Sequence, residues 1–358
     1  MTFTLKVGPL TAGERRAWRD LSCLGEGWSG FDLPAPMAPV LRTSIYEYGR
    51  PAFELKLDRG DTQLVAARIE EAVWLPRRII VDTKKGIVSE GSFRRPSLAP
   101  NEMMFEEMPD PQLRVPGLSY HLTTKHRGFG HILLEGLSQA WAIDYTAAER
   151  LIVNKSFSSI ARTLIAPLSQ LPIMEVDSPV RFESLIVASQ SYRLDGAISA
   201  RFVEMCQRIR EFYAPNAKQK YVLYVSRRLA GKRRLKTELI IEDRLRELGA
   251  VIMNPEKVDL QDQIRHFASA SVVIGPIGSA LYNCVFCKPG TIRIILAPET
   301  FHTRNDTLLS AFTMTKAHYL FGPSEGHTRA EGMSSNWTIP ADVVVDTVRR
   351  LAASHLSQ

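Results

Sequence analysis

The sequence lacks long hydrophobic runs and has little cysteine. No segment approaches the ~18 uninterrupted apolar residues typical of a membrane-spanning helix, so none is expected. The N-terminal residues contain no apolar stretch suited to a signal peptide. Four cysteines are too few and too scattered for a disulfide framework. These absences favour a protein of the reducing cytoplasm, and peripheral contact with a membrane through basic surface stays open.

The chain also lacks repeats of fixed period and low-complexity tracts. Its 358 residues, 45% hydrophobic and 23% charged, are typical of a globular protein of two domains. The net charge of +7 favours a nucleic acid, an anionic membrane or a phosphorylated substrate as partner, although a mildly basic enzyme has the same charge. The basic residues gather in one loop without interleaved aromatic residues, which disfavours nucleic acid.

The second half of the chain alternates between two kinds of apolar pattern. Short β-branched runs indicate strands at 221–226, 250–254, 271–274 and 291–296. Amphipathic stretches between them indicate helices at 237–249, 260–270 and 279–286. Such alternation predicts a parallel sheet with helices on both faces, and ligands of such sheets bind beyond the carboxyl ends of the strands.

The first half is less regular. Up to about residue 118 the chain holds short β-like runs between prolines, and residues 84–118 read as a loop with five prolines. From Gly128 onward, apolar residues at helical spacing predict a helix as far as about 145. Strands follow at 151–154 and 184–188, and the amphipathic helix at 198–213 could bridge two domains.

One loop concentrates positive charge. Residues 226–238 follow a predicted strand and precede a predicted helix, and they contain Arg227, Arg228, Lys232, Arg233, Arg234 and Lys236. Guanidinium groups suit a diphosphate because each can donate two parallel N–H bonds. We therefore expect Arg227 and one of Arg233 and Arg234 to bind phosphate. A solvated basic loop or a patch for anionic lipid is the alternative.

A glycine turn lies between the strand at 271–274 and the next helix. A turn that opens a helix leaves backbone N–H groups unpaired, here those of Gly278, Ser279 and Ala280, and such a place can hold phosphate. The turn has neither the dinucleotide-binding spacing nor the Gly-Lys-Ser/Thr of a P-loop. A tight strand-to-helix turn without a ligand is the alternative.

Two further pairs could carry chemistry. His131 and Glu135 are four residues apart and share a helix face, so the histidine could act as a general base beside the carboxylate. A capping or packing histidine is the alternative. Cys284 and Cys287 have the spacing of a zinc or redox pair, but no second pair lies nearby, so we expect two buried thiols and no metal.

Five segments, in this order, resemble the glycosyltransferase 61 family, which includes bacterial capsular-polysaccharide enzymes. The resemblance extends from about Gly128 to Tyr319. It rests on Gly128–Glu135, on Ser226-Arg227 with Arg233-Arg234 and Thr237-Glu238, on Gln263, on Gly275–Asn283 and on Phe286–Gly290. Two positions depart from the family. Ile277 stands where a histidine is usual, and Ile294 and Ile295 occupy a strand that usually holds an acidic residue.

The resemblance implies an α/β fold of the GT-B type, with two facing Rossmann-like domains, a cleft between them and extra β structure in the N-terminal part. Residues 1–191 would then bind the acceptor and residues 192–340 the nucleotide sugar. The helix within 341–358 could cross back to the first domain.

The resemblance also implies an inverting glycosyltransferase that needs neither a metal nor a cofactor. It would move a sugar from a nucleotide-sugar donor, a UDP-sugar, to a glycan or lipid-linked glycan acceptor in polysaccharide biosynthesis, in the cytoplasm or peripherally at the inner membrane. His131 or Glu135 would be the base. The implied donor-binding residues are Arg227, Arg233, Arg234, Glu238, Gly278, Ser279, Ala280 and Asn283.

Two other functions stay open. A non-catalytic module that binds sugar nucleotides or glycans would keep this fold, and Ile277 favours it because isoleucine cannot hydrogen-bond a phosphate or hydroxyl. An oxidoreductase with a doubly wound sheet fits less well because the glycine spacing is wrong.

Overall fold

The computed structural model describes residues 3–8, 47–48, 64, 66–76, 79–83, 86–92, 102–105, 111–125, 127–193, 197–301 and 303–356. The chain divides into two compact units. Unit 1 comprises Met1–Leu33 and Asp58–Met205, and unit 2 comprises Pro34–Leu57 and Cys206–Gln358. The division falls within helix α5 (Ala200–Tyr213). The assignment of acceptor and donor binding to the two parts stays a prediction.

Unit 2 is built on a six-stranded parallel sheet in the order β14-β13-β15-β16-β17-β2. The strands are β13 (Tyr221–Val225), β14 (Val251–Met253), β15 (Ala270–Pro276), β16 (Ile292–Pro298), β17 (Lys316–Gly322) and β2 (Glu47–Tyr48). The alternating strands and helices read from the sequence are confirmed here. The strand β2 reaches this sheet from far upstream in the chain, which no local pattern indicated.

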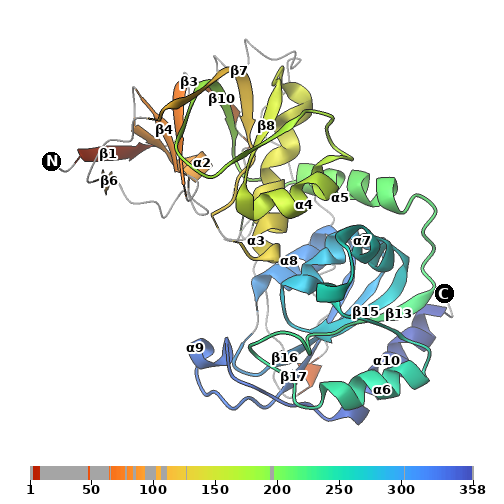
Figure 1. Ribbon diagram of the computed structural model, residues 1–358. Helices are drawn as coiled ribbons and strands as arrows, with labels where there is room; N and C mark the ends of the chain where they lie inside the picture. The colour runs from red at the N-terminus through yellow and green to blue at the C-terminus, as the bar shows by residue number, and fades with distance from the viewer. Residues whose placement is uncertain are drawn as a thin grey trace. The chain divides into compact units, whose positions relative to one another are not determined.

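Helices cover both faces of this sheet (Figure 1). On one face, α6 (Glu238–Glu247) and α10 (Ala341–Leu356) pack on a core of buried strand residues with Trp337 and the α10 valines. The other face carries α7 (Leu260–Ser269), η6 (Ser279–Phe286) and α8 (Arg304–Phe312). The short helices η5 (Pro255–Lys257) and α9 (Arg329–Gly332) lie in loops. A crossing of the final helix to the first domain stays a prediction; the helix packs mainly against α6 and β15 of unit 2.

Helix α6 shows how the local sequence sets an element. It begins after Thr237 and is followed by Gly249, whose φ of +81° is a left-handed conformation that favours glycine. Thr237 occupies the N-cap position, but its hydroxyl donates to the carbonyl of Ile339, 2.8 Å away. Thr237 therefore ties the start of α6 to the segment before α10.

Unit 1 contains a nine-stranded mixed sheet in the order β6-β1-β5-β4-β3-β10-β7-β8-β9. Its strands are β1 (Phe3–Gly8), β3 (Ala66–Leu75), β4 (Ile79–Asp82), β5 (Gly86–Val88), β6 (Glu102–Phe105), β7 (Leu113–His121), β8 (Arg150–Asn154), β9 (Ile173–Val176) and β10 (Val180–Ala188). The block β10-β7-β8-β9 is parallel. Helices α2 (Ser89–Ser92) and α4 (Lys155–Ile165) and the small ribbon of β11 (Tyr192–Arg193) and β12 (Ala197–Ile198) complete this unit.

The interpretation of residues 84–118 as a loop is wrong. Strand β7 pairs with both β10 and β8 although it contains Pro116. The pairing with β10 shifts register beside Pro116 and Gly117, where two residues of β7 face the single Glu183. A bulge leaves a residue out of the ladder, so a proline without an N–H is tolerated there. Proline-rich sequence therefore concealed a central strand.

The helix predicted from Gly128 exists, but it is not a regular α-helix. It begins as α3 (Phe129–His131), continues as a π-helical turn, η3 (Ile132–Gly136), and ends as a 3-10 helix, η4 (Leu137–Tyr145). The spacing of apolar residues predicts which face of a helix is buried, but it does not predict whether the helix is α, π or 3-10. No helix among the described residues combines the length and apolar character required to cross a membrane.

Candidate active site

The candidate site lies at the carboxyl ends of β13 and β15 in the unit 2 sheet. The chain leaves β13 toward β14 on one side and returns to β15 on the other, so the strand order reverses at this point. Ligands of open α/β sheets bind at such switch points. The segment after β13 carries Arg227, and the segment after β15 carries Ile277 and Gly278.

Arg227 lies against the glycine turn. Its guanidinium donates from Nη1 to the carbonyl of Ile277 at 3.2 Å and from Nη2 to the carbonyl of Lys232 at 3.0 Å. A Cβ atom on Gly278 would collide with Nη1 of Arg227. Glycine at position 278 therefore lets the guanidinium of Arg227 approach the backbone there.

Arg233 reaches the same carbonyl from the other end of the basic loop. Its Nη2 lies 3.3 Å from the Ile277 oxygen, and its guanidinium stacks 4.4 Å above the ring centre of Phe301. The backbone of Arg233 has a φ of +56°, which is strained for a residue other than glycine. Ser334 and the indole of Trp337 hold this conformation by hydrogen bonds of 3.0 and 3.3 Å to its backbone. Such strain often marks a functional position.

Two cations thus share one carbonyl. The hydrogen bonds of both guanidinium groups to described residues all go to backbone oxygens, and both Nε atoms are buried there without a partner. Burial, together with the like charge of Arg227, lowers the pKa of Arg233 to about 10. Burial also lowers the pKa of Arg227. An anion bound here would relieve the repulsion and complete the hydrogen bonds.

Glu238 supports the loop from beneath. Its buried carboxylate accepts a hydrogen bond of 2.6 Å from the backbone N–H of Arg227 and one of 3.3 Å from the hydroxyl of Tyr224. Burial raises the pKa of Glu238 to about 7, and the neighbouring Glu242 adds to the shift while the N–H of Arg227 opposes it. The structure therefore places Glu238 as an anchor of Arg227.

The other expected donor-binding residues divide into two groups. Ser279 is exposed and Ala280 half-buried at the start of η6, which is a 3-10 helix, so its first N–H groups lack partners within the helix. Asn283 is fully buried and donates to Gln263, whose amide holds the carbonyls of Pro255 and Val258. Asn283 therefore braces the loop after β14.

Arg234 differs from Arg233. Its side chain is exposed, and its backbone pairs with Asn336 and Trp337 at 3.3 and 3.1 Å. The sequence left open which of the two arginines faces the turn, and the structure brings Arg233 to the Ile277 carbonyl. The side chain of Ile277 itself is 1% exposed and belongs to the core, so only its backbone faces the two cations.

His131 and Glu135 form a close pair in unit 1. Nδ1 of His131 lies 2.6 Å from Oε1 of Glu135, and the carboxylate is 1% exposed while the imidazole is 36% exposed. A buried carboxylate that accepts a hydrogen bond from Nδ1–H fixes the orientation of the imidazole ring. The lone pair of the neutral ring is then on Nε2. This arrangement is suited to a general base whose outer nitrogen takes a proton.

The family model of Glycosyltransferase 61 matches residues 129–294. The matched segment begins beside His131 and ends in β16, so it contains the histidine pair, the basic loop and the glycine turn. Residues 129–294 thus match the glycosyltransferase 61 family. The protein is accordingly a glycosyltransferase, as its resemblance predicted.

The other comparisons are more distant. No curated protein matches this glycosyltransferase in sequence. Among solved structures, it is similar to the bacterial iron-containing dodecameric glycosyltransferase TibC from enterotoxigenic E. coli H10407. The two are 14% identical with a TM-score of 0.32, and the alignment covers 78% of this chain and 86% of that chain.

Sequence reasoning missed a buried ion pair behind the site. Arg293 of β16 and Asp306 of α8 lie 3.0 Å apart and are at most 1% exposed. Arg293 also bonds Ser310, and Thr303 donates to Asp306. This pair fastens α8 to the sheet next to the loop that carries Phe301. A lone arginine in the apolar run Ile292–Leu296 was the available signal, because a charge buried in a strand needs a partner.

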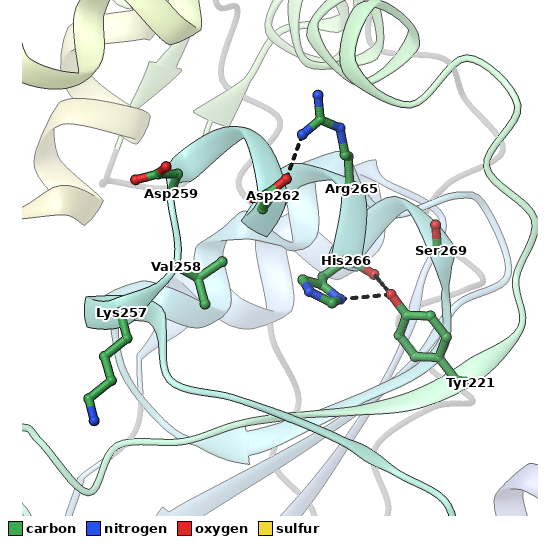
Figure 2. Close-up of a pocket in the computed structure, with 8 residues that line it drawn as sticks. All are labelled: Tyr221, Lys257, Val258, Asp259, Asp262, Arg265, His266 and Ser269. Atoms are coloured by element: carbon green, nitrogen blue, oxygen red, sulfur yellow. Dashed lines mark hydrogen bonds and ion pairs between the residues drawn. The ribbon is translucent and has the colours of Figure 1, made fainter.

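A hollow along α7 is separate from the arginine site (Figure 2). Tyr221 and His266 share a hydrogen bond of 2.9 Å within it, and Asp262 and Arg265 form an ion pair on its rim. The charged side chains that line this hollow are of both signs and partly paired, whereas those at the Ile277 carbonyl are two guanidinium groups. Across the residues that the structure describes, no three His, Cys, Asp or Glu side chains gather into a group able to hold a metal.

Proposed function

We propose that this glycosyltransferase uses Arg227 and Arg233 to bind the diphosphate of a nucleotide sugar, a UDP-sugar. The observation that carries the proposal is the convergence of both guanidinium groups on the Ile277 carbonyl, beside the glycine turn at the switch point of the sheet. The N–H groups of Gly278, Ser279 and Ala280 would add donors from the start of η6.

The proposed reaction is a single displacement with inversion. His131 removes the proton from an acceptor hydroxyl, and Glu135 stabilises the imidazolium that forms. The oxygen attacks C1 of the donor sugar while the bond from C1 to the diphosphate oxygen breaks. The electron pair and the negative charge pass to the leaving nucleoside diphosphate, where Arg227 and Arg233 stabilise them.

This scheme does not require a metal, because two guanidinium groups and a helix start can neutralise the diphosphate as a divalent cation does in other enzymes. We further propose the GT-B architecture, in which two α/β domains face each other, with unit 1 serving the acceptor and unit 2 the donor. The acceptor would be a glycan or lipid-linked glycan of polysaccharide biosynthesis.

The match of residues 129–294 to the glycosyltransferase 61 family model favours this enzyme over the binding module and the oxidoreductase. The isoleucine at position 277 is compatible with catalysis, because its carbonyl and not its side chain faces the two arginines. A chain that binds donors but transfers sugar to no acceptor would revive the binding module.

Thermal unfolding with UDP-, GDP-, CMP- and dTDP-sugars tests the donor site. A donor at 100 times its Kd should stabilise the protein by about 2.7 kcal/mol. Arg227→Ala and Arg233→Ala should abolish most of the shift, and Arg234→Ala should have a smaller effect. Arg246→Ala is the control, since Arg246 is exposed on α6 and pairs with Asp243.

Failure of every nucleotide sugar to raise the melting temperature would overturn the diphosphate site. With a donor in hand, NMR of the product anomer tests inversion. Unchanged turnover after exhaustive EDTA treatment would support metal independence, and restored activity on adding back a divalent cation would contradict it.

A further inference from the structure

The helix that carries the histidine pair changes its hydrogen-bond ladder just after Glu135. The π-turn η3 ends at Gly136 and the 3-10 helix η4 begins at Leu137. The backbone hydrogen-bond pattern therefore changes from i+5 to i+3 at this junction.

Two side chains donate hydrogen bonds to the carbonyl of Glu135 at this junction. The hydroxyl of Ser138 donates to it at 2.9 Å, and Nε2 of Gln139 donates to it at 3.0 Å. Both side chains are fully buried. The backbone oxygen of the carboxylate-bearing residue is therefore held from two sides, which restricts where its side chain can point.

Gln139 also connects this helix to the sheet. Its Nε2 lies 3.1 Å from the carbonyl of Thr123, in the segment that follows β7, and its backbone carbonyl accepts from the hydroxyl of Tyr120. Ser138 is tied in turn to Ser191, whose N–H and hydroxyl donate to its carbonyl. The junction is thus fastened to the carboxyl ends of both β7 and β10.

We propose that Gln139, assisted by Ser138, is a positioning residue for the catalytic pair. It holds the π-to-3-10 junction so that the carboxylate of Glu135 meets Nδ1 of His131. The inference rests on the proposed function, in which His131 is the base. The inference predicts a specific tautomer of His131. Its neutral ring carries the proton on Nδ1, whereas histidine in water prefers the proton on Nε2.

Nitrogen-15 NMR of the histidine rings in the full chain at pH 8 tests the inference, with His131 assigned by its loss in His131→Asn. The unmodified protein should show the Nδ1-protonated form of His131. Gln139→Met, which keeps the volume but removes the donor, should shift His131 toward the Nε2-protonated form. Gln170→Met is the matched control, because the exposed Gln170 makes the same kind of bond to a carbonyl four residues earlier.

Kinetics supply the second readout. With the UDP-sugar that gives the largest thermal shift, Gln139→Met should lower kcat about 10²-fold with little change in the KM for donor, as expected for a small misplacement of a catalytic group. The double variant Gln139→Met/His131→Ala should have the same kcat as His131→Ala alone, since both residues act through one base. Ser138→Ala should produce the same changes in tautomer and kcat, but smaller ones. It is the variant to measure if Gln139→Met does not fold.

The outcomes separate the two claims. An Nε2-protonated His131 in the unmodified protein would overturn the histidine–carboxylate pair as a base. An Nδ1-protonated His131 that persists in Gln139→Met and in Ser138→Ala, with unchanged kcat, would overturn the positioning role alone. A lower melting temperature with an unchanged tautomer would show that Gln139 only stabilises the fold.

Discussion

The two candidate sites are held in different ways. In unit 2 the arginines stand on loops at the switch point of a parallel sheet, and their described hydrogen bonds go to backbone carbonyls. In unit 1 His131 ends α3, and Glu135 lies on the π-helical turn that follows, where buried serine and glutamine side chains hold its carbonyl. The arginine site has hydrogen-bonding capacity left for an anion, whereas the histidine pair is oriented internally. Under the proposed function, the arginine site receives negative charge and the histidine pair moves a proton.

Replacing His131 by Ala tests the proton-transfer half of this contrast and should have the largest effect. Loss of a general base should lower turnover about 10²- to 10⁴-fold. The thermal shift with donor should be unaffected, because the proposed donor residues belong to unit 2. The control is His266→Ala, on the separate hollow of α7. Equal turnover in the two variants would remove His131 from the mechanism.

Replacing Asp306 by Ala probes the support behind the arginine site. The change leaves Arg293 buried without its partner, which should destabilise unit 2 by about 3–5 kcal/mol in urea unfolding. Asp346→Ala removes an exposed ion pair with Arg349 in the same unit and should cost at most about 1 kcal/mol. Similar losses for both variants would show that the buried pair has no special role.

Glu238→Gln tests how burial of the loop anchor couples stability to pH. Because its pKa rises from 4.5 to about 7 on folding, the folded chain binds more protons between these values. That stabilisation is complete below the unfolded pKa and is lost as pH rises through about 7. Between pH 5 and 8 the unmodified protein should therefore lose up to about 3 kcal/mol relative to Glu238→Gln.

Urea midpoints at each pH give this difference directly. Glu247→Gln, at the exposed end of α6, is the control and should follow the unmodified protein. Parallel curves for Glu238→Gln and the unmodified protein would contradict the proposed coupling.

Gly278→Ala should have the smallest effect and the most selective one. The backbone of Gly278 is extended, so alanine causes no strain there, but its Cβ would displace the guanidinium of Arg227. Stability should change by less than about 1 kcal/mol. Donor affinity should fall about tenfold, or 1.4 kcal/mol, in a titration with the best nucleotide sugar. Unchanged affinity would argue that Arg227 does not bind the diphosphate in its present position.

The sequence alone predicted more of the structure of unit 2 than of unit 1. Fully buried parallel strands such as β15 are continuous apolar runs, so the pattern of Ala270–Pro276 could be read directly. It also indicated that cations and a glycine turn would meet at one edge, as Arg227 and Gly278 do. In unit 1, the strand β7 was hidden by Pro116, because its bulge depends on pairing with β10. The spacing of apolar residues likewise did not predict the π-turn that contains Glu135.

The sequence by itself indicated the resemblance to the glycosyltransferase 61 family, the parallel sheet of unit 2 and the residue types of both candidate sites, because these depend on local periodicity and on the order of short segments. Only the tertiary structure decided that Arg233 rather than Arg234 reaches the Ile277 carbonyl, and that Glu238 and Asn283 act as braces. It alone revealed Arg293 with Asp306, and Gln139 beneath the histidine pair. These choices arise from contacts between residues distant in the chain, where a backbone angle or a buried partner sets the direction of each side chain.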